Sequence, residues 1–426
     1  MTSKQQDSSN RSDQVDRQFA DECTNCGICL EVCPFFPSSK FADKGPQNTI
    51  EKVTSLLKGG DITEEAYEMA YSCARGCSRL CAKACPVGLV PRDGLASTRL
   101  RMASAGKPAP APHYYSEPAH RYYYVRVLSA LQPKFSDARW FNTVPADPFQ
   151  ADVVFYPGCA ASSMAHLTMD VMGLLDKMGI NFATLAGGDL CCGIGYSLVG
   201  DPKAAQDAGR QLVAAISAFR PKKVLNFCVG CHRTLGTRLP KQVDVPFESQ
   251  WLPEFFLENV DKLPFEQNPG KKVAVHDSCA TTLSPDDLEV TRKLIQAIPG
   301  ASLVDMEHNR ANALCCGGNN NTARPEVGRH IRSAVMDEAA ATGADVLATH
   351  CSGCHKAFSR LEHGYPFEVK NYVSLLAEAV GIRHEDTLKK YANYRNLDKV
   401  LAESRDCIEA SDFTLEEMRR ILPDYL

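Results

Sequence analysis

The sequence has little excess of either charge and no long apolar run. Its 426 residues include 47 basic and 51 acidic side chains, which gives a formal net charge of −4. Without a basic excess to displace counterions, we do not expect the chain to bind nucleic acid. The longest uncharged stretch, 153–169, is interrupted by proline, glycine, serine and histidine. A transmembrane segment is therefore not expected either.

An export signal and a nucleotide-binding fingerprint are also missing. Residues 1–20 are polar and lack the apolar core of a signal peptide. This predicts a cytoplasmic protein, and peripheral docking on the cytoplasmic face of a membrane stays compatible with it. No GxGxxG motif is present, so we expect any flavin to be carried by a separate partner chain.

Cysteine is the residue that stands out, with 19 copies. This share is too small for a disulfide scaffold, and disulfides are rare in a reducing cytoplasm. The cysteines are therefore expected to bind metal or to take part in redox chemistry, and their spacing has to decide between these roles.

The first cysteine group has the spacing C-x2-C-x2-C-x3-C-P and consists of Cys23, Cys26, Cys29 and Cys33. This spacing is typical of ferredoxins, in which three thiolates hold one cubane cluster and the fourth binds a neighbouring cluster. Gly27 allows the tight turn, and Pro34 ends the loop. The alternatives are a zinc site, which usually shows two separated C-x2-C pairs, or buried structural thiols.

A second group ends in the same C-x3-C-P and consists of Cys73, Cys77, Cys81 and Cys85. Its first two gaps are three residues long instead of two, which leaves the loop geometry open. With the usual exchange of the fourth ligand, one cluster takes Cys23, Cys26, Cys29 and Cys85, and the other takes Cys73, Cys77, Cys81 and Cys33.

The next ten cysteines form a repeat. Cys159, Cys191, Cys192, Cys228 and Cys231 recur 120 to 124 residues later as Cys279, Cys315, Cys316, Cys351 and Cys354. Five cysteines in register twice over indicate two copies of one domain. Five ligands also exceed the four of a cubane cluster or a tetrahedral zinc ion.

Alternating strands and helices are predicted in both copies. The expected strands are 152–157, 180–185 and 223–227 in the first copy and 272–276, 302–306 and 346–350 in the second, with helices near 164–178, 201–219, 286–298 and 326–342. Each cysteine group then follows the carboxyl end of a strand, the edge at which open α/β sheets bind ligands.

The overall prediction is a multidomain α+β and α/β protein. We expect a mostly helical, ferredoxin-like dicluster domain over 1–105, a linker rich in proline and aromatics over 106–150, two tandem α/β domains over 151–265 and 266–385, and a charged helical tail over 386–426. The tail is a candidate for partner docking. Tyr122, Tyr123 and Tyr124 are expected to pack on their neighbours, and Cys407 is expected to be a plain thiol.

Two other interpretations of the repeat remain open. Adjacent cysteines can form a vicinal disulfide, although this would leave the other three cysteines of each set unexplained. The sequences from Cys228 to His232 and from Cys351 to His355 also match C-x-x-C-H, the attachment motif of c-type haem. We favour a supporting role for both histidines, as donors beside a cluster or as residues at a helix start.

The chain resembles a known family. The motifs CTNCGICLEVCP, CAKACPVGL, FYPGC, DLCCG, NFCVGCH, VHDSC, ALCCGG and THCSGCH, spread over about residues 23–375, are similar to heterodisulfide reductases in which the ferredoxin-like and CCG parts are fused. They are also similar to the iron–sulfur subunits of anaerobic glycerol-3-phosphate dehydrogenase and glycolate oxidase. Asn319, Asn320 and Asn321 depart from the family, because relatives are often glycine-rich there.

The resemblance implies cofactors and an activity. Two cubane [4Fe–4S] clusters would occupy the N-terminal sites, and a non-cubane [4Fe–4S] cluster would occupy each CCG domain. The first CCG cluster would be held by Cys159, Cys191, Cys192, Cys228 and Cys231, and the second by Cys279, Cys315, Cys316, Cys351 and Cys354. Catalysis would centre on Cys191, Cys192, Cys231, Cys315, Cys316 and Cys354.

Two functions follow as hypotheses. The first is an oxidoreductase subunit that carries electrons from the cubane clusters to the CCG clusters and reduces or forms a disulfide. The second is a non-catalytic relay between a flavoprotein dehydrogenase and a membrane quinone or cytochrome partner. A zinc-stabilised interaction protein is a weaker third hypothesis, because the ligand sets do not come in fours.

Overall fold

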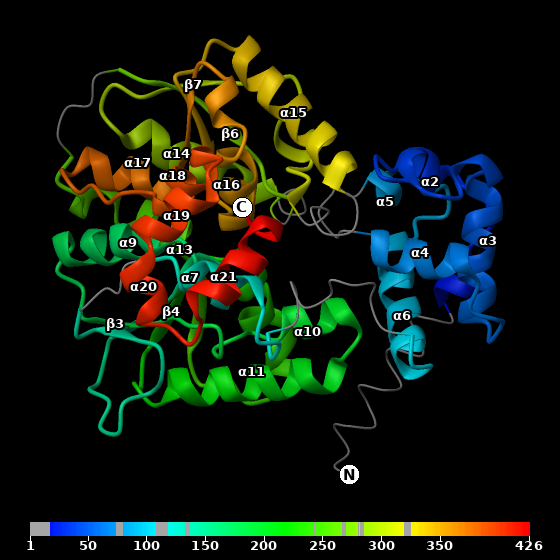
Figure 1. Cartoon of the computed structure of the whole chain (residues 1–426), viewed down its shortest axis with the longest axis horizontal. Helices are drawn as coiled ribbons and strands as arrows, with labels where there is room; N and C mark the ends of the chain where they lie inside the picture. The colour runs from blue at the N-terminus through cyan, green and yellow to red at the C-terminus, as the bar shows by residue number, and fades with distance from the viewer. Residues whose placement is uncertain are drawn as a thin grey trace.

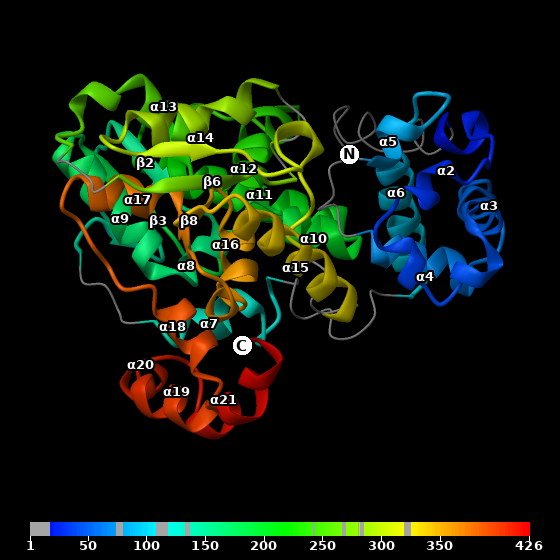
Figure 2. The same ribbon diagram turned by 90° about the horizontal axis from the view of Figure 1, so that it is seen from above.

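The computed structural model describes residues 18–73, 80–107, 118–132, 137–241, 243–265, 270–279, 281, 285–318 and 325–426, so Cys77 and Asn319–Asn321 lie outside the described residues. A helical lobe formed by residues 18–107 lies beside a larger body that contains two sheets (Figure 1). In both views the lobe faces the part of the body that carries α10 (Ile194–Val199) and α15 (Pro325–Ala341) (Figure 2).

The lobe is all-helical in its described part. It contains α2 (Ile28–Glu31), η1 (Phe36–Ser38), η2 (Ala42–Lys44), α3 (Pro46–Leu57), α4 (Glu64–Ser72), α5 (Leu80–Ala84) and α6 (Pro91–Ser104). Ile50, Val53 and Met102 are fully buried between α3, α4 and α6, and Cys23, Cys33, Cys73, Cys81 and Cys85 pack against the same core. The helices therefore act as a scaffold for the cysteine loops.

The first sheet is parallel throughout and has the strand order β1-β3-β2-β4-β5. Its elements are β1 (Trp140–Phe141), β2 (Val153–Tyr156), α8 (Cys159–Ser162), α9 (Ala165–Lys177), β3 (Phe182–Leu185), α10, α11 (Pro202–Ser217), β4 (Lys223–Asn226), α12 (Val229–Arg233), η4 (Thr234–Arg238), η5 (Leu239–Lys241), β5 (Glu248–Trp251), α13 (Leu252–Glu258) and η6 (Val260–Lys262).

The second sheet is also parallel and has the order β7-β6-β8-β9. Its elements are β6 (Lys272–His276), α14 (Pro285–Ala297), β7 (Ser302–Val304), η7 (Arg310–Asn312), α15, β8 (Val346–Thr349), α16 (Ser352–Ser359), η9 (Glu362–Gly364), β9 (Glu368–Asn371) and α17 (Tyr372–Ala379). The two sheets repeat one order of strands, apart from the extra edge strand β1 in the first.

The predicted strands and helices of the repeat all exist, with ends that move by one or two residues. Three short strands were missed, namely β1, β5 and β9. Each lies at a sheet edge, and the last two carry charged or polar residues at alternate positions, so no apolar run marks them in the sequence. The mixed helix and parallel-sheet α/β architecture is confirmed.

The two faces of each sheet belong to different cores. Val153 and Phe155 of β2 point into a core shared by both units, whereas Val154 and Tyr156 point into a core private to the first unit. This follows from the period of two along a strand. In the shared core, α9 packs against α17 and α13 packs against α14. The first long helix of each unit (α9 or α14) therefore packs against the last helix of the other unit (α17 or α13). The two units are thus arranged like a pseudo-twofold pair.

The C-terminal helices complete the shared core. They are α18 (Thr387–Tyr394), α19 (Leu397–Glu403), α20 (Arg405–Glu409), α21 (Leu415–Ile421) and η10 (Leu422–Asp424). Their apolar residues Leu388, Val400, Ile408 and Met418 are buried in this core, so that face is not available to a partner. The sequence identified the helices of this segment but not their packing.

The C-terminal helices also hold the segment before α7 (Tyr124–Ser129). Arg121 forms an ion pair with Glu417 at 3.0 Å. The ring of Tyr122 stacks on Phe413, with centroids 6.4 Å apart, and its backbone carbonyl accepts a hydrogen bond from the Tyr425 hydroxyl. Of the region 106–150 that was expected to be a linker, the described residues 118–132 thus pack into the body, and β1 extends the first sheet.

A buried ion pair involves Asp277, the residue directly after β6. We expect its loss to lower the stability of the protein. Arg292 donates to Asp277 Oδ1 at 2.6 Å and to Oδ2 at 2.8 Å, with both side chains at most 2% exposed. Arg292→Met leaves a buried carboxylate without its cation, so the free energy of unfolding should fall by about 3 kcal/mol. Urea denaturation followed by circular dichroism under anaerobic conditions measures this change.

The matched control is Lys203→Met. Lys203 forms an exposed i,i+4 ion pair with Asp207 on α11, and exposed pairs contribute little to stability. The control should unfold like the unaltered protein, and an equal stability of the two variants would contradict the prediction.

Candidate metal centres

The first cysteine quintet gathers at the carboxyl edge of the first sheet. Cys159 begins α8 after β2, Cys191 and Cys192 follow β3, Cys228 follows β4, and Cys231 lies in α12. Because β2, β3 and β4 are parallel, their carboxyl ends meet at one edge. All five side chains are buried or partly buried.

The thiols of this quintet are in mutual contact. The Sγ atoms of Cys192 and Cys231 are 3.5 Å apart. Hydrogen bonds from Cys191 and Cys231 lower the pKa of Cys192 to about 5, although burial opposes this shift. Cys192 is therefore a thiolate at neutral pH, which is the form of cysteine that binds metal.

Two tyrosines, Tyr123 and Tyr124, pack beside the first quintet. The hydroxyl of Tyr123 donates a hydrogen bond to Cys159 Sγ at 3.2 Å, and both residues are buried together with Cys191. Tyr124 packs edge-on against Tyr123, and Lys356 from the second unit lies 4.5 Å above the Tyr124 ring. The sequence predicted packing for these tyrosines, and the hydrogen bond to the Cys159 sulfur was missed because nothing in the local pattern marks it.

The second quintet repeats this arrangement. Cys279 follows β6, Cys315 and Cys316 follow η7, Cys351 follows β8, and Cys354 lies in α16. Hydrogen bonds from Cys315 and then Cys354 lower the pKa of Cys316 well below its ordinary value, again against the effect of burial. In both quintets the second cysteine of the pair therefore has its pKa lowered by two neighbouring cysteines.

A glycine directly after each cysteine pair is required by the backbone. Gly193 has φ +90° and Gly317 has φ +65°, a left-handed conformation that favours glycine. Their amides donate to the Sγ atoms of Cys191 and Cys315, at 3.3 Å in both cases. A Cβ atom on Gly193 would collide with the Ala205 carbonyl oxygen, and one on Gly317 would collide with that of Gly328.

The cysteines of the helical lobe also converge. Burial raises the pKa of Cys29 to about 12, and the nearby charges of Cys23, Cys26 and Cys85 add to the shift. Cys85 is thus a neighbour of the first group, as the predicted ligand exchange requires. Gly27 has φ +81°, in agreement with the expected tight turn, and Arg99 donates to the Cys73 carbonyl and fixes the start of the second loop.

The lobe meets the second quintet directly. Phe35 is 3% exposed and forms one apolar cluster with Cys315 and Ile331, against which Cys33 packs. Lys83 of α5 donates to the Ala311 carbonyl oxygen, close to the Cys315–Cys316 pair in the sequence. The second quintet therefore lies at the interface with the lobe. Phe35 was not singled out from the sequence, since only its position after Cys33 could have marked it.

The two quintets also adjoin each other. A hydrogen bond from Cys231 lowers the pKa of Cys228, while burial and the nearby charge of Cys351 oppose that shift. Cys228 and Cys351 belong to different units. Helix α8, which begins at Cys159, packs against α16, which carries Cys354, so the two cysteine sets are neighbours. Tyr124 and Lys356 lie at the same boundary.

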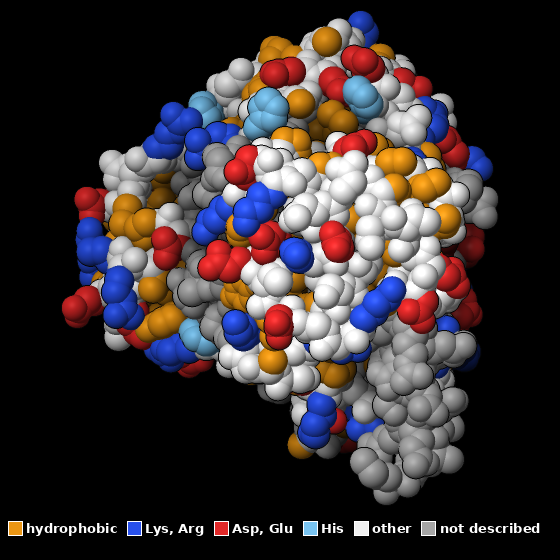
Figure 3. All heavy atoms as spheres, turned by 90° about the vertical axis from the view of Figure 1, so that its right-hand side faces the viewer, with side chains coloured by type: hydrophobic (Ala, Val, Ile, Leu, Met, Phe, Trp, Pro, Cys, Tyr) orange, Lys and Arg blue, Asp and Glu red, His pale blue; other side chains and the backbone are white. Residues whose placement is uncertain are grey.

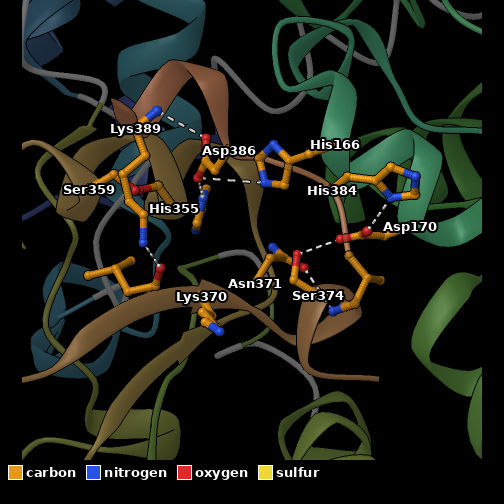
Figure 4. Close-up of polar contacts among 12 residues, drawn as sticks. His166, Asp170, His355, Ser359, Lys370, Asn371, Ser374, His384, Asp386 and Lys389 are labelled. Atoms are coloured by element: carbon orange, nitrogen blue, oxygen red, sulfur yellow. Dashed lines mark hydrogen bonds and ion pairs between the residues drawn. The ribbon is translucent and has the colours of Figure 1, made fainter. Parts of the chain in front are cut away.

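The histidines of the C-x-x-C-H motifs bond to residues other than cysteine. His232 Nδ1 is 3.3 Å from Ser249 Oγ, and His355 Nε2 is 2.6 Å from Asp386 Oδ2. His166 from α9 faces the same carboxylate at 3.6 Å (Figure 4). Asp386, whose side chain is 13% exposed, thus joins both units to the C-terminal helices.

The donor sets fit iron–sulfur clusters. None of the 18 cysteines among the described residues is in a disulfide, so the adjacent pairs do not form vicinal disulfides. Each quintet supplies five soft sulfur donors at a largely buried site, and in each the pKa of the second cysteine of the pair is lowered. The neighbouring thiols cause the low pKa in both cases, because burial acts in the opposite direction.

Comparison with protein families matches these regions. A 4Fe–4S dicluster domain covers residues 19–89, and a cysteine-rich domain known as CCG covers residues 153–236 and again 273–359. The chain is an iron–sulfur protein with one dicluster domain and two CCG domains. The predicted resemblance to heterodisulfide reductases is confirmed by the relatives below.

Several relatives of this iron–sulfur protein are oxidoreductases or subunits of oxidoreductases. It is 28% identical over 256 residues to a subunit of the dihydromethanophenazine:CoB–CoM heterodisulfide reductase of Methanosarcina mazei, and the match covers 57% of this chain and 63% of the relative. It is 24% identical over 181 residues to the EtfAB:quinone oxidoreductase of Syntrophomonas wolfei, covering 41% of this chain and 25% of the relative. The chain thus spans about three fifths of the length of the heterodisulfide reductase component.

One solved structure is also similar. The crystal structure of a hypothetical protein from Helicobacter pylori matches 72% of this chain and 61% of its own chain, with a TM-score of 0.43 and 13% sequence identity. A likeness of this size carries no argument about function or fold.

The glycine after each cysteine pair gives a testable prediction. Gly317→Ala forces a Cβ atom into the Gly328 carbonyl of α15 and displaces the loop of Cys315 and Cys316. We expect the iron content of the anaerobically purified protein to fall by the share of one cluster, as measured by elemental analysis.

Gly343→Ala is the matched control. Gly343 has φ +67°, close to the φ of +65° at Gly317, but nothing lies within 4 Å of its hypothetical Cβ atom. It therefore carries the same backbone strain, about 1 kcal/mol, without the collision. Equal iron loss in both variants would show that strain alone, not the close approach of α15, explains the effect.

Proposed function

We propose that this protein is an iron–sulfur oxidoreductase subunit that transfers electrons to a disulfide or a similar thiol-linked substrate. It would hold two cubane clusters in the helical lobe and one non-cubane cluster in each CCG domain. Its electron donor would be a flavoprotein or another redox subunit, and it would act in the cytoplasm. When bound, such clusters supply one-electron transfer.

The observation that carries this proposal is the continuous series of ligand sets. Cys23, Cys26, Cys29 and Cys85 lie at one end, and Cys33 packs with Phe35 and Cys315 at the boundary with the body. From there α16, which carries Cys354 of the second quintet, packs against α8, which begins at Cys159 of the first. These contacts support an electron path from the helical lobe to the second CCG domain and on to the first.

Adjacent CCG sites suit a two-electron substrate. Reduction of a disulfide takes two electrons and two protons and breaks one S–S bond to give two thiols. A pair of one-electron sites at the same place can deliver both electrons. Two relatives support this class of substrate, since one belongs to a CoB–CoM heterodisulfide reductase and another belongs to the CoM/CoB fumarate reductase of Methanothermobacter marburgensis.

A relay function is the second candidate, supported by the similarity to an EtfAB:quinone oxidoreductase. In this case the chain would pass electrons between a flavoprotein and a quinone or cytochrome subunit at the membrane. Among the described residues, no helix combines the length and the apolar character needed to cross a bilayer. The exposed face of the helical lobe carries basic and acidic side chains intermixed (Figure 3), which fits a partner with a similarly mixed surface.

The number of clusters is the first test. The anaerobically purified protein should contain about 16 iron atoms per chain, four for each of four clusters. Cys316→Ser should remove the signal of one CCG cluster from the EPR spectrum and about four iron atoms, and Cys192→Ser should remove the other. Cys407→Ser is the control and should change neither, because Cys407 lies outside every ligand set. About eight iron atoms in the unaltered protein would contradict the four-cluster proposal.

The nature of the electron acceptor is the second test. Protein reduced chemically under anaerobic conditions is mixed with a disulfide, such as an asymmetric alkyl disulfide, and in parallel with a quinone analogue. We expect the disulfide to reoxidise the protein, with two thiols formed per two electrons, and Cys316→Ser to abolish this reaction. Reoxidation by the quinone analogue alone would instead establish the relay.

A further inference from the structure

The buried imidazole of His276 has no hydrogen-bond partner. It is the last residue of β6, it is 1% exposed, and neither ring nitrogen has a partner in the described structure. A neutral imidazole carries one N–H donor, and a protonated one carries two. A buried donor without an acceptor costs about 1–3 kcal/mol, so a group that accepts this hydrogen bond is expected at the site.

The ring of His276 lies against the second quintet. One of its nitrogens and the Sγ atoms of Cys316 and Cys354 all lie within 4.8 Å of one another. On another side the ring meets the edge of Phe358, with centroids 4.7 Å apart at an interplanar angle of 81°. Asp277, Glu338 and His350 also lie near this ring, but none of them forms a hydrogen bond with it in the described structure.

The equivalent residue of the first unit is satisfied by the protein itself. Tyr156 is the last residue of β2, at the same distance in sequence from Cys159 as His276 is from Cys279. Its hydroxyl donates to the backbone carbonyl of Leu190 at 2.6 Å. The two units therefore differ at the carboxyl ends of the equivalent strands β2 and β6.

We propose that His276 donates a hydrogen bond to the iron–sulfur cluster held by the second quintet and thereby raises the reduction potential of that cluster above the potential it would have without this donor. This inference rests on the proposed function, because it requires a cluster at the second quintet. It assigns His276 as a positioning residue that tunes the cluster, and it leaves the five cysteines as the ligands.

The direction of the effect follows from charge. Reduction adds one negative charge to the cluster, so an N–H donor stabilises the reduced form more than the oxidised form. In the first quintet the Tyr123 hydroxyl donates a hydrogen bond to Cys159. In the second, His276 lies close to Cys316 and Cys354 instead. The two CCG sites are therefore expected to be inequivalent in potential although their cysteines match.

The test is a redox titration of the full-length protein with four clusters, followed by EPR. His276→Phe keeps a ring of similar size and removes the donor. We expect the ratio of reduced to oxidised second CCG cluster at a fixed potential to fall about tenfold, equivalent to about 59 mV for a one-electron couple. The other three clusters should keep their potentials, and His276→Asn or His276→Gln, which carry an amide N–H, should recover part of the shift.

Tyr156→Phe is the matched control in the first unit. Because the Tyr156 hydroxyl bonds to Leu190, this variant should leave all potentials unchanged. An unchanged potential in His276→Phe would overturn the inference, and so would an equal shift in the Tyr156 variant. Loss of about four iron atoms in His276→Phe would also overturn it, because His276 would then be an iron ligand.

A second measurement covers the case in which His276→Phe does not fold. Pulsed EPR of the unaltered protein labelled with ¹⁵N-histidine should show a weak histidine coupling at one CCG cluster. No histidine coupling, or one as strong as a direct iron–nitrogen bond, would overturn the inference. An unaltered protein without iron at the second quintet would overturn the proposed function itself, so the two failures are distinguishable.

Discussion

Parallel pairing of short strands is the constraint on which both CCG sites depend. Within each sheet the strands run in one direction, so the loops that follow them leave from a single edge. Cysteines that are tens of residues apart in sequence reach one place only for this reason. A glycine with positive φ then lets each cysteine pair approach the first turn of the following long helix. Strand direction, more than any single contact, assembles the five thiols.

Much of this arrangement was predictable from the sequence, because cysteine spacing and apolar strands are local signals. The duplicated register of Cys159 and Cys279 led to two α/β units, and the strand boundaries were correct within two residues. The contacts between distant segments were not predictable. Nothing near Phe35 indicates that it packs beside Cys315, and the alternation of β5 is too polar to stand out as a strand. Such features depend on tertiary packing, which no local pattern encodes.

The two units share an architecture but differ in their polar surroundings. The first has tyrosines at its cysteines, whereas the second has the buried pair of Asp277 and Arg292 and the histidines His276 and His350. The five cysteines are thus the same in both units, whereas the side chains packed around them differ. The second unit also faces the helical lobe through Cys315. The two cysteine sets therefore differ in the polar residues around them, and among the described residues only the second is shown in contact with the helical lobe.

The anchoring of residues 121–122 by the C-terminal helices has a consequence for biosynthesis. Arg121 and Tyr122 are held by Glu417, Phe413 and Tyr425, and the next residue, Tyr123, closes the first quintet. During translation these anchors leave the ribosome long after all five cysteines of that quintet. The surroundings of Cys159 can therefore reach their final packing only after the C-terminal helices have been synthesised and have folded.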